Sequence, residues 1–255
     1  MHARVFAVIV FVLICVSSIQ ASDWQVVYSQ DFSTDPSWDT NNPARYYQDP
    51  STGTYQVKQT NVNYGGFYGL YDASRVLGSW QVQYDIKITS SQYASDVSFG
   101  LYSTDPESDA HGSYARVIFT TEDRGRTILM GTRGADNVSK ADWDAHLPRW
   151  SFDSWYRVTM TYDSSASFLT ASVGLRDEGT PLGILSISGV GPYSSDMDSI
   201  GSSNYRGHSG FQVPGSETSG QIDNVSLSIP EPATITALFI GGLITTYNRR
   251  RSMHT

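Results

Sequence analysis

A run of aromatic residues interleaved with glycine is the stretch of this sequence best suited to contact a ligand. It reads Tyr64-Gly-Gly-Phe-Tyr-Gly-Leu-Tyr71, with Asp72 and Arg75 close behind. Flat rings beside an accessible backbone can stack on pyranose faces while acid, amide and guanidinium groups bond the hydroxyls. Any single ring could instead line a hydrophobic core. Together with two tryptophans from a later irregular segment, the candidate sugar-binding residues are Tyr64, Tyr68, Tyr71, Arg75, Trp143 and Trp150.

The acidic residues lack the arrangement that glycoside hydrolysis requires. Retaining hydrolases hold two carboxyl groups about 5 Å apart, whereas the five glutamates of this chain are scattered among turns, strand ends and the C-terminal segment. Asp85 is the one acid in the middle of an alternating segment, and no acid lies two residues away from it. Gly-x-Ser-x-Gly and His-Glu-x-x-His motifs are absent as well. We predict that the protein is not an enzyme, although two distant loops could still bring a pair of aspartates together.

Alternating apolar and polar residues predict the strands that would carry these side chains. In Trp80–Ile88 every second residue is apolar and the others are polar, which is typical of a half-buried antiparallel strand. About ten such strands, separated by Asp, Ser, Gly and Pro turns, predict an all-β sandwich of two antiparallel sheets. Only residues 136–154 break the rhythm, and we expect one helical turn there, capped by Ser139. The other predicted strands are 24–32, 53–59, 97–102, 114–120, 127–131, 155–163, 168–173, 182–188 and 221–228.

The charge of the predicted sandwich limits its partners. Residues 22–228 contain 13 Lys and Arg against 24 Asp and Glu, a net charge of −11, and no cysteine. Such a surface repels DNA, RNA and anionic lipid, so we expect no nucleic-acid partner. Without disulfides, stability must come from the core or from a bound metal.

Several of these patterns resemble concanavalin A-like or laminin G-like jelly-roll domains. The resemblance extends over nearly all of residues 22–228 and implies a two-sheet jelly roll, a fold that does not by itself imply an activity. The segments that carry it are 30–32, 46–49, 97–101, 114–119, 155–163 and 221–227.

The same resemblance suggests a structural calcium ion. In carbohydrate-binding sandwiches of related type, an acid in the last strand and oxygens near the first strand often hold Ca²⁺, and Asp223 and Asp31 stand at matching places. Backbone carbonyls could complete the six to eight oxygens that the ion takes. Alternatively, the two carboxylates cap nearby backbone groups.

The first 21 residues have the layout of a secretory signal peptide. Arg4 precedes the apolar run Val5–Val16, and small residues lead to a preferred cleavage site after Ala21. The only cysteine of the chain, Cys15, lies inside this segment.

The last 27 residues, 229–255, combine three features: a Pro-Glu-Pro motif, a short apolar stretch and a cluster of arginines. The uncharged stretch Ala233–Tyr247 would span about 22 Å as a helix, less than the ~30 Å of a bilayer core. The order of these features resembles the PEP-CTERM sorting signal of Gram-negative bacteria, which implies recognition by the membrane enzyme exosortase. A plain C-terminal anchor is the alternative. The residues that match the signal are Pro230, Glu231, Pro232, Arg249, Arg250 and Arg251.

The sequence therefore predicts a signal peptide (1–21), one β-sandwich (22–228) and a sorting signal with a short transmembrane helix (229–255). We expect a protein exported through the inner membrane to the cell surface or exopolysaccharide matrix. Its expected role is non-catalytic binding of carbohydrate or matrix. A purely structural surface protein without a ligand is the alternative, and a glycoside hydrolase is the least favoured.

Overall fold

The structure is a computed structural model in which every described element is a β-strand. No helix in this part of the chain is long and apolar enough to cross a membrane. The predicted signal peptide and C-terminal helix lie outside the described residues, which are 24–40, 42–60, 65–71, 78–92, 95–103, 113–122, 125–135, 139–142, 150–179, 181–193, 197–204 and 217–231.

The chain separates into two compact units, and residues 26–229 form the one that contains the sandwich. The other unit comprises residues 1–25 and 230–255, of which the structure describes only 24, 25, 230 and 231.

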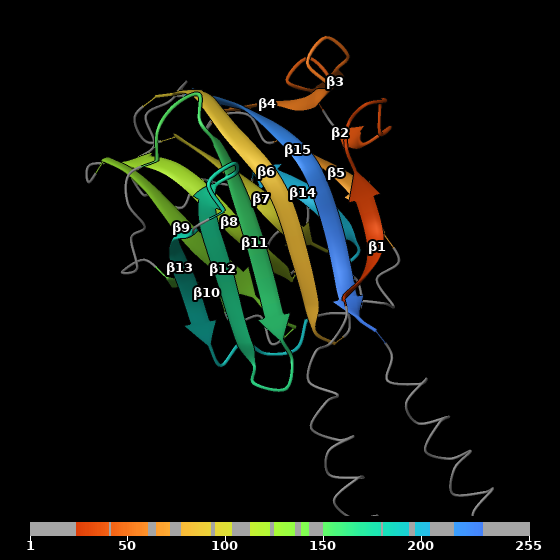
Figure 1. The fold of residues 1–255 in the computed structure, drawn as a ribbon, viewed down its shortest axis with the longest axis vertical. Coiled ribbons are helices and arrows are strands. Elements are labelled where there is room, and N and C mark those ends of the chain that lie inside the picture. Colours follow the sequence, from red (N-terminus) through yellow and green to blue (C-terminus); the bar gives the residue numbers. More distant parts are fainter. Residues whose placement is uncertain are drawn as a thin grey trace, which may run out of the picture. The chain divides into compact units, whose positions relative to one another are not determined.

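Eight antiparallel strands form the first sheet, sheet A. The long strands β11, β6 and β15 lie side by side at its centre, and β1 also pairs with β15 (Figure 1). In order across the sheet, the strands are β13 (Pro181–Ser188), β12 (Phe168–Leu175), β11 (Trp155–Asp163), β6 (Trp80–Ser91), β15 (Glu217–Pro230), β4 (Thr54–Thr60) and β3 (Tyr46–Asp49), with β1 (Trp24–Gln30) beside β15.

Seven antiparallel strands form the second sheet, sheet B, which lies behind sheet A in Figure 1. In order they are β10 (Ser139–Asp142), β9 (Gly125–Arg133), β8 (Tyr114–Glu122), β7 (Ser95–Tyr102), β14 (Ser199–Asn204), β5 (Gly65–Leu70) and β2 (Asp39–Thr40). The two sheets make the predicted all-β sandwich.

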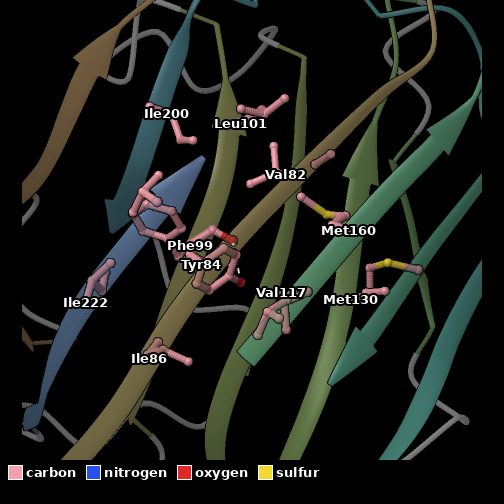
Figure 2. Close-up of a cluster of buried hydrophobic side chains, with 14 of the residues drawn as sticks. Val82, Tyr84, Ile86, Phe99, Leu101, Val117, Met130, Met160, Ile200 and Ile222 are labelled. Carbon is pink, nitrogen blue, oxygen red and sulfur yellow. Dashed lines mark hydrogen bonds between the residues drawn. The ribbon is translucent and has the colours of Figure 1, made fainter. Parts of the chain in front are cut away.

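The core consists of alternate side chains from the two sheets. Tyr84 of β6 and Phe99 of β7 meet with ring centroids 4.6 Å apart, and the Tyr84 hydroxyl donates a hydrogen bond to the Phe99 carbonyl oxygen. Figure 2 shows these two rings beside aliphatic and Met side chains from both sheets. Removing each large apolar side chain from water contributes about 1.5–3 kcal/mol, so this layer is the main source of stability.

All ten predicted strands coincide with observed strands, and the alternation of β6 is confirmed. Trp80, Val82, Tyr84, Ile86 and Ile88 are buried, as expected. The strands that the sequence analysis missed, β2, β3, β5, β10 and β14, are short or rich in glycine and serine.

The predicted helical turn capped by Ser139 is wrong. Ser139 is instead the first residue of β10 and pairs with Arg133 of β9. Backbone pairing with an available sheet edge outweighs the local capping preference of a single serine.

Two glycines of sheet B stand where a side chain would collide with the neighbouring strand. A Cβ atom on Gly100 of β7 would lie 2.0 Å from the Ala115 carbonyl oxygen, and one on Gly201 of β14 would lie 2.1 Å from that of Phe67. Both obstacles are backbone atoms, which cannot rotate away. The close approach of strands β8, β7, β14 and β5 therefore requires glycine at both positions.

We expect Gly100→Ala and Gly201→Ala each to lower the free energy of unfolding by about 1–3 kcal/mol, because the neighbouring strands must shift. Gly78→Ala is the matched control, since nothing lies within 4 Å of a Cβ atom there. Urea denaturation of the domain measures all three. Equal midpoints for the three variants would contradict the close approach.

Candidate functional site

Among the predicted sugar-binding residues that the structure describes, Tyr68 presents its ring on an outer face of the sandwich. On β5 the preceding residue, Phe67, points into the core and is fully buried, so Tyr68 points to the outer face of sheet B and is half-buried. Its partner across the ladder is Asp39 of β2, and the phenol donates a long hydrogen bond of 3.5 Å to Asp39 Oδ2. The pair presents a ring and an exposed carboxylate on one surface.

Trp150 is a core residue, and the prediction that it is a stacking surface is wrong. Its ring is fully buried and lies edge-on to Phe119, with centroids 6.2 Å apart. The indole N–H donates to the carbonyl oxygens of Thr120 and Thr127, at 3.3 and 3.1 Å. Trp150 thus packs in the core although it lies outside the predicted strands, and backbone carbonyl groups accept the hydrogen bonds of its indole N–H.

Tyr71 also has a structural role. Its ring packs against the core, and its hydroxyl donates a 2.6 Å hydrogen bond to the Met197 carbonyl oxygen. Burial, together with the charge of Asp198, raises the pKa of the Tyr71 phenol well above its ordinary value. The alternative that some rings of the aromatic run line the core therefore holds for Tyr71. Three further candidates, Tyr64, Arg75 and Trp143, lie outside the described residues.

A row of paired residues crosses the outer face of sheet B beside Tyr68. Strand register aligns Tyr68 with Gly201, then Gly100, then Arg116 and finally Gly131. Adjacent strands lie about 4.8 Å apart, so Tyr68 and Arg116 are separated by about 14 Å of sheet. The two positions between them carry no side chain beyond hydrogen. We refer to the part of this row from Tyr68 to Arg116 as the glycine row.

Tyr102 lies along β7 above Gly100. Ser98 and Tyr102 stand two residues before and after Gly100 on the same face, and their hydroxyls are 3.3 Å apart. The Tyr102 ring must therefore pass over Gly100 to reach Ser98. Both hydroxyl-bearing residues are buried.

Arg116 supplies a positive charge at one end of the glycine row. Its side chain is only 6% exposed, and its guanidinium carbon is 4.7 Å from the centroid of the Tyr114 ring. Burial by itself lowers the pKa of this guanidinium, but Tyr102, Tyr114 and Asp96 outweigh that effect, and the pKa is raised. Arg116 therefore keeps its charge. The row has an acid and a phenol at one end and a cation at the other.

Asp85 is a buried carboxylate on the outer face of sheet A. The side chain of Asp85 is 0% exposed. Arg157 of β11 forms a bidentate ion pair with this carboxylate, with Nε 2.8 Å from Oδ1 and Nη2 3.0 Å from Oδ2. Asn224 Nδ2 of β15 donates a third hydrogen bond of 2.9 Å to Oδ2. The sequence left open whether Arg157 faces a ligand or bridges an aspartate, and the structure selects the bridge.

Asp223 lies directly across from Asp85, a neighbour that the sequence analysis did not find because it comes from a distant strand. The pKa of the Asp223 carboxyl is raised above its ordinary value, mainly because the group is partly buried. The negative charges of Asp85 and Asp31 also raise this pKa, whereas the backbone N–H of Asn224 and the charge of Arg176 lower it. Asp31 directly follows β1, which pairs with β15, so the two predicted calcium ligands lie in the same region of the fold.

Both predicted calcium ligands also make the local bonds of the alternative interpretation. Asp31 Oδ1 accepts hydrogen bonds from the backbone N–H and hydroxyl of Ser33, at 3.0 and 2.8 Å. Asp223 accepts from the backbone N–H and the amide of Asn224, at 2.8 and 3.1 Å. Among the described side chains, no group of three His, Cys, Asp or Glu is placed to hold a metal. Calcium binding stays a prediction that would depend mainly on backbone oxygens.

The structure reaches only the beginning of the predicted sorting signal. Pro230 is the last residue of β15, and Glu231 after it is exposed. Pro232 and Arg249, Arg250 and Arg251 lie outside the described residues.

We expect Arg157→Gln to lower the free energy of unfolding by about 2 kcal/mol, because it leaves the Asp85 carboxylate buried with only Asn224 as a partner. The double variant Asp85→Asn/Arg157→Gln should be more stable than Arg157→Gln, since no buried charge remains. Arg176→Gln is the control, because its ion pair with Asp177 is exposed and should contribute less than about 1 kcal/mol. Thermal and urea unfolding test this order. A double variant less stable than Arg157→Gln would contradict it.

Comparison with known proteins finds similarity in structure only. No protein-family model matches the sequence, and no curated protein matches it. The chain is similar to the CBM2 module of the evolved Dit protein of Lactobacillus casei BL23 phage J-1, with a TM-score of 0.53 and 14% identity over 82% of this chain and 97% of the module.

Two plant lectins give the same result. The seed lectin of Lotus tetragonolobus has a TM-score of 0.53 and 14% identity over 80% of this chain and 99% of the lectin. The winged bean acidic lectin, in complex with methyl-α-D-galactose, has a TM-score of 0.51 and 14% identity over 81% and 98% of the two chains. The chain therefore has the concanavalin A-like jelly-roll fold that its strand patterns resemble.

Proposed function

We propose that this domain is a non-catalytic carbohydrate-binding module that uses the outer face of sheet B. The observation that carries the proposal is the accessible Tyr68–Asp39 pair beside the glycine row. An aromatic ring offers a flat apolar surface to the C–H groups of a sugar, and an exposed carboxylate accepts hydrogen bonds from hydroxyls. The fold supports the proposal, because it is shared with lectins and with a CBM2 module.

The part of the glycine row that is open to a ligand is its Tyr68 end, where Asp39 is exposed. Gly201, the partner of Tyr68 across the ladder, has no side chain of its own, whereas the Tyr102 ring lies over Gly100. Arg116 at the far end is held by its neighbours and buried, so it sets the charge of the surface more than it reaches outward.

The proposed module does not hydrolyse its ligand. Asp85 is poorly placed to act as a proton donor or nucleophile, because it is buried, ion-paired with Arg157 and hydrogen-bonded through both carboxylate oxygens. Its neighbour Asp223 bonds Asn224. Glycoside cleavage needs a proton donor and a second carboxylate free on either side of one bond. These contacts favour a structural role for the two acids.

Export and sorting complete the proposal. The N-terminal segment would direct the chain through the inner membrane, and the C-terminal Pro-Glu-Pro signal would present it to exosortase, with the cell surface or exopolysaccharide matrix as the destination. Glu231 supports this, since a charge next to an apolar span gives a plain anchor no benefit.

We expect Tyr68→Ala to weaken binding to any glycan that the domain recognises by about fivefold, the equivalent of ~1 kcal/mol of ring contact. A glycan array probed with residues 22–228 identifies the ligand, and titration of that ligand measures the loss. Tyr68→Phe keeps the ring and should retain most of the affinity.

Tyr47→Ala is the matched control, because Tyr47 is 48% exposed but lies on β3 of the other sheet. Its affinity should equal that of the unaltered domain, and the bound glycans should release no reducing sugar. A silent array with folded protein would instead favour a structural surface protein. Turnover that disappears in Asp85→Asn would contradict the non-catalytic role.

For the sorting signal, we expect Glu231→Ala to leave the protein exported but retained in the inner membrane, because recognition rather than anchoring depends on this charge. Glu178→Ala is the control, since Glu178 is an exposed glutamate of the sandwich. Fractionation of tagged cells locates each variant. Surface delivery of Glu231→Ala, and of a chain lacking Arg249–Arg251, would reduce the segment to a plain anchor.

A further inference from the structure

Trp155 lies between two cations on the outer face of sheet A. Along β11 its neighbour Tyr156 is buried in the core, so Trp155 points outward. Lys87 of β6 is its partner across the ladder, with Nζ 5.0 Å from the ring centroid. Arg176, just beyond β12, donates its backbone N–H to the Trp155 carbonyl oxygen, and its guanidinium carbon is also 5.0 Å from the ring.

Arg157 adds a third cation to the same face. It stands two residues after Trp155, and its side chain is 41% exposed although Asp85 holds two of its nitrogens. Within the described part of the chain, the third nitrogen, Nη1, has no hydrogen-bond partner. Gly174 pairs with Arg157 on the β12 side and has no side chain to cover it. Asp85 therefore fixes the guanidinium in place and leaves one edge of it directed away from the pair.

The charges of this group are only partly neutralised. Arg157 is paired with the buried Asp85, and Arg176 with Asp177, which is 80% exposed and therefore a weak partner. Lys87 forms no ion pair with any described residue. Asp223, across the ladder from Asp85, also acts on Arg157 and Arg176, so three acids stand near the three cations. Lys87 and the outward edge of the Arg157 guanidinium are the positive groups left to bind an anion. We call Lys87, Trp155, Arg157 and Arg176 the cationic cluster.

We propose that the cationic cluster is a second binding site, which takes the carboxylate or sulfate groups of an anionic polysaccharide. Guanidinium and ammonium groups give strong, charge-assisted hydrogen bonds to such oxyanions. The indole ring supplies an apolar surface for the sugar that carries the anion. The site lies on sheet A, so it goes beyond the proposed function of sheet B and does not share its residues.

The probes are polygalacturonate for carboxylate, dextran sulfate for sulfate and neutral dextran as the blank. The full domain should bind at least one anionic polymer and not dextran, and added NaCl should weaken the binding. Lys87→Gln and Arg176→Gln should each reduce affinity about threefold, and the double variant about tenfold. Neither variant disturbs the Asp85–Arg157 bond, so both are expected to stay folded, which melting curves verify.

Arg126→Gln is the matched control. Its guanidinium also lies over rings, 5.5 Å from Trp150 and 5.0 Å from Phe152, so it loses the same charge and the same kind of contact elsewhere. Its affinity should be unchanged, as should that of Tyr68→Ala. Preference for polygalacturonate assigns a carboxylate ligand, and preference for dextran sulfate assigns a sulfate. Failure of both polymers to bind, or equal losses in Arg126→Gln and Lys87→Gln, would overturn the second site and leave the sheet B proposal untouched.

Discussion

The contact between the inner faces of the two sheets is the interaction on which the remaining features depend. Side chains alternate along a strand, so each central strand commits one face to the core and leaves the other for water or ligands. Tyr84 and Phe99, from opposite sheets, meet within this core. Because their burial fixes the register of β6 and β7, it also fixes where Asp85 and Gly100 stand on the two outer faces.

The sequence predicted those elements in which alternation and burial coincide. Strand β6 was predicted because five apolar residues alternate with polar ones, whereas β14, with the sequence Ser-Ile-Gly-Ser-Ser-Asn, offers one apolar residue and no period. Its place between β7 and β5 is decided by backbone approach at Gly100 and Gly201, a tertiary effect that no local pattern records. Trp150 was misassigned for a related reason: nothing near it in sequence indicates that its acceptors are the carbonyl oxygens of Thr120 and Thr127.

The two outer faces differ in the chemistry that they can offer. On sheet B the central positions are glycines flanked by buried hydroxyls, and the accessible polar groups gather at the Tyr68–Asp39 end. On sheet A a buried carboxylate organises its neighbours across three strands, since Asp85 holds Arg157 on one side and Asn224 on the other. An accessible ring beside an exposed carboxylate suits a sugar ring, whereas cations fixed around an indole ring suit a charged substituent. One fold can therefore carry two different kinds of contact without sharing residues.

A β-bulge in β15 keeps apolar side chains of this strand in the core and places a polar side chain on the outer face. Between the pairs Asp223–Asp85 and Ser226–Gln83, β15 has one more residue than β6. If the same residues alternated strictly from Ile222, without a bulge, Val225 and Leu227, which are both buried, would point outward. The extra residue is Asn224, whose φ of 50° lies in a region unfavourable for most side chains. Asparagine tolerates that conformation better than most residues, and here its amide also bonds the buried Asp85 carboxylate. A single position thus resets the strand for the core and supplies the third hydrogen bond that a buried charge requires.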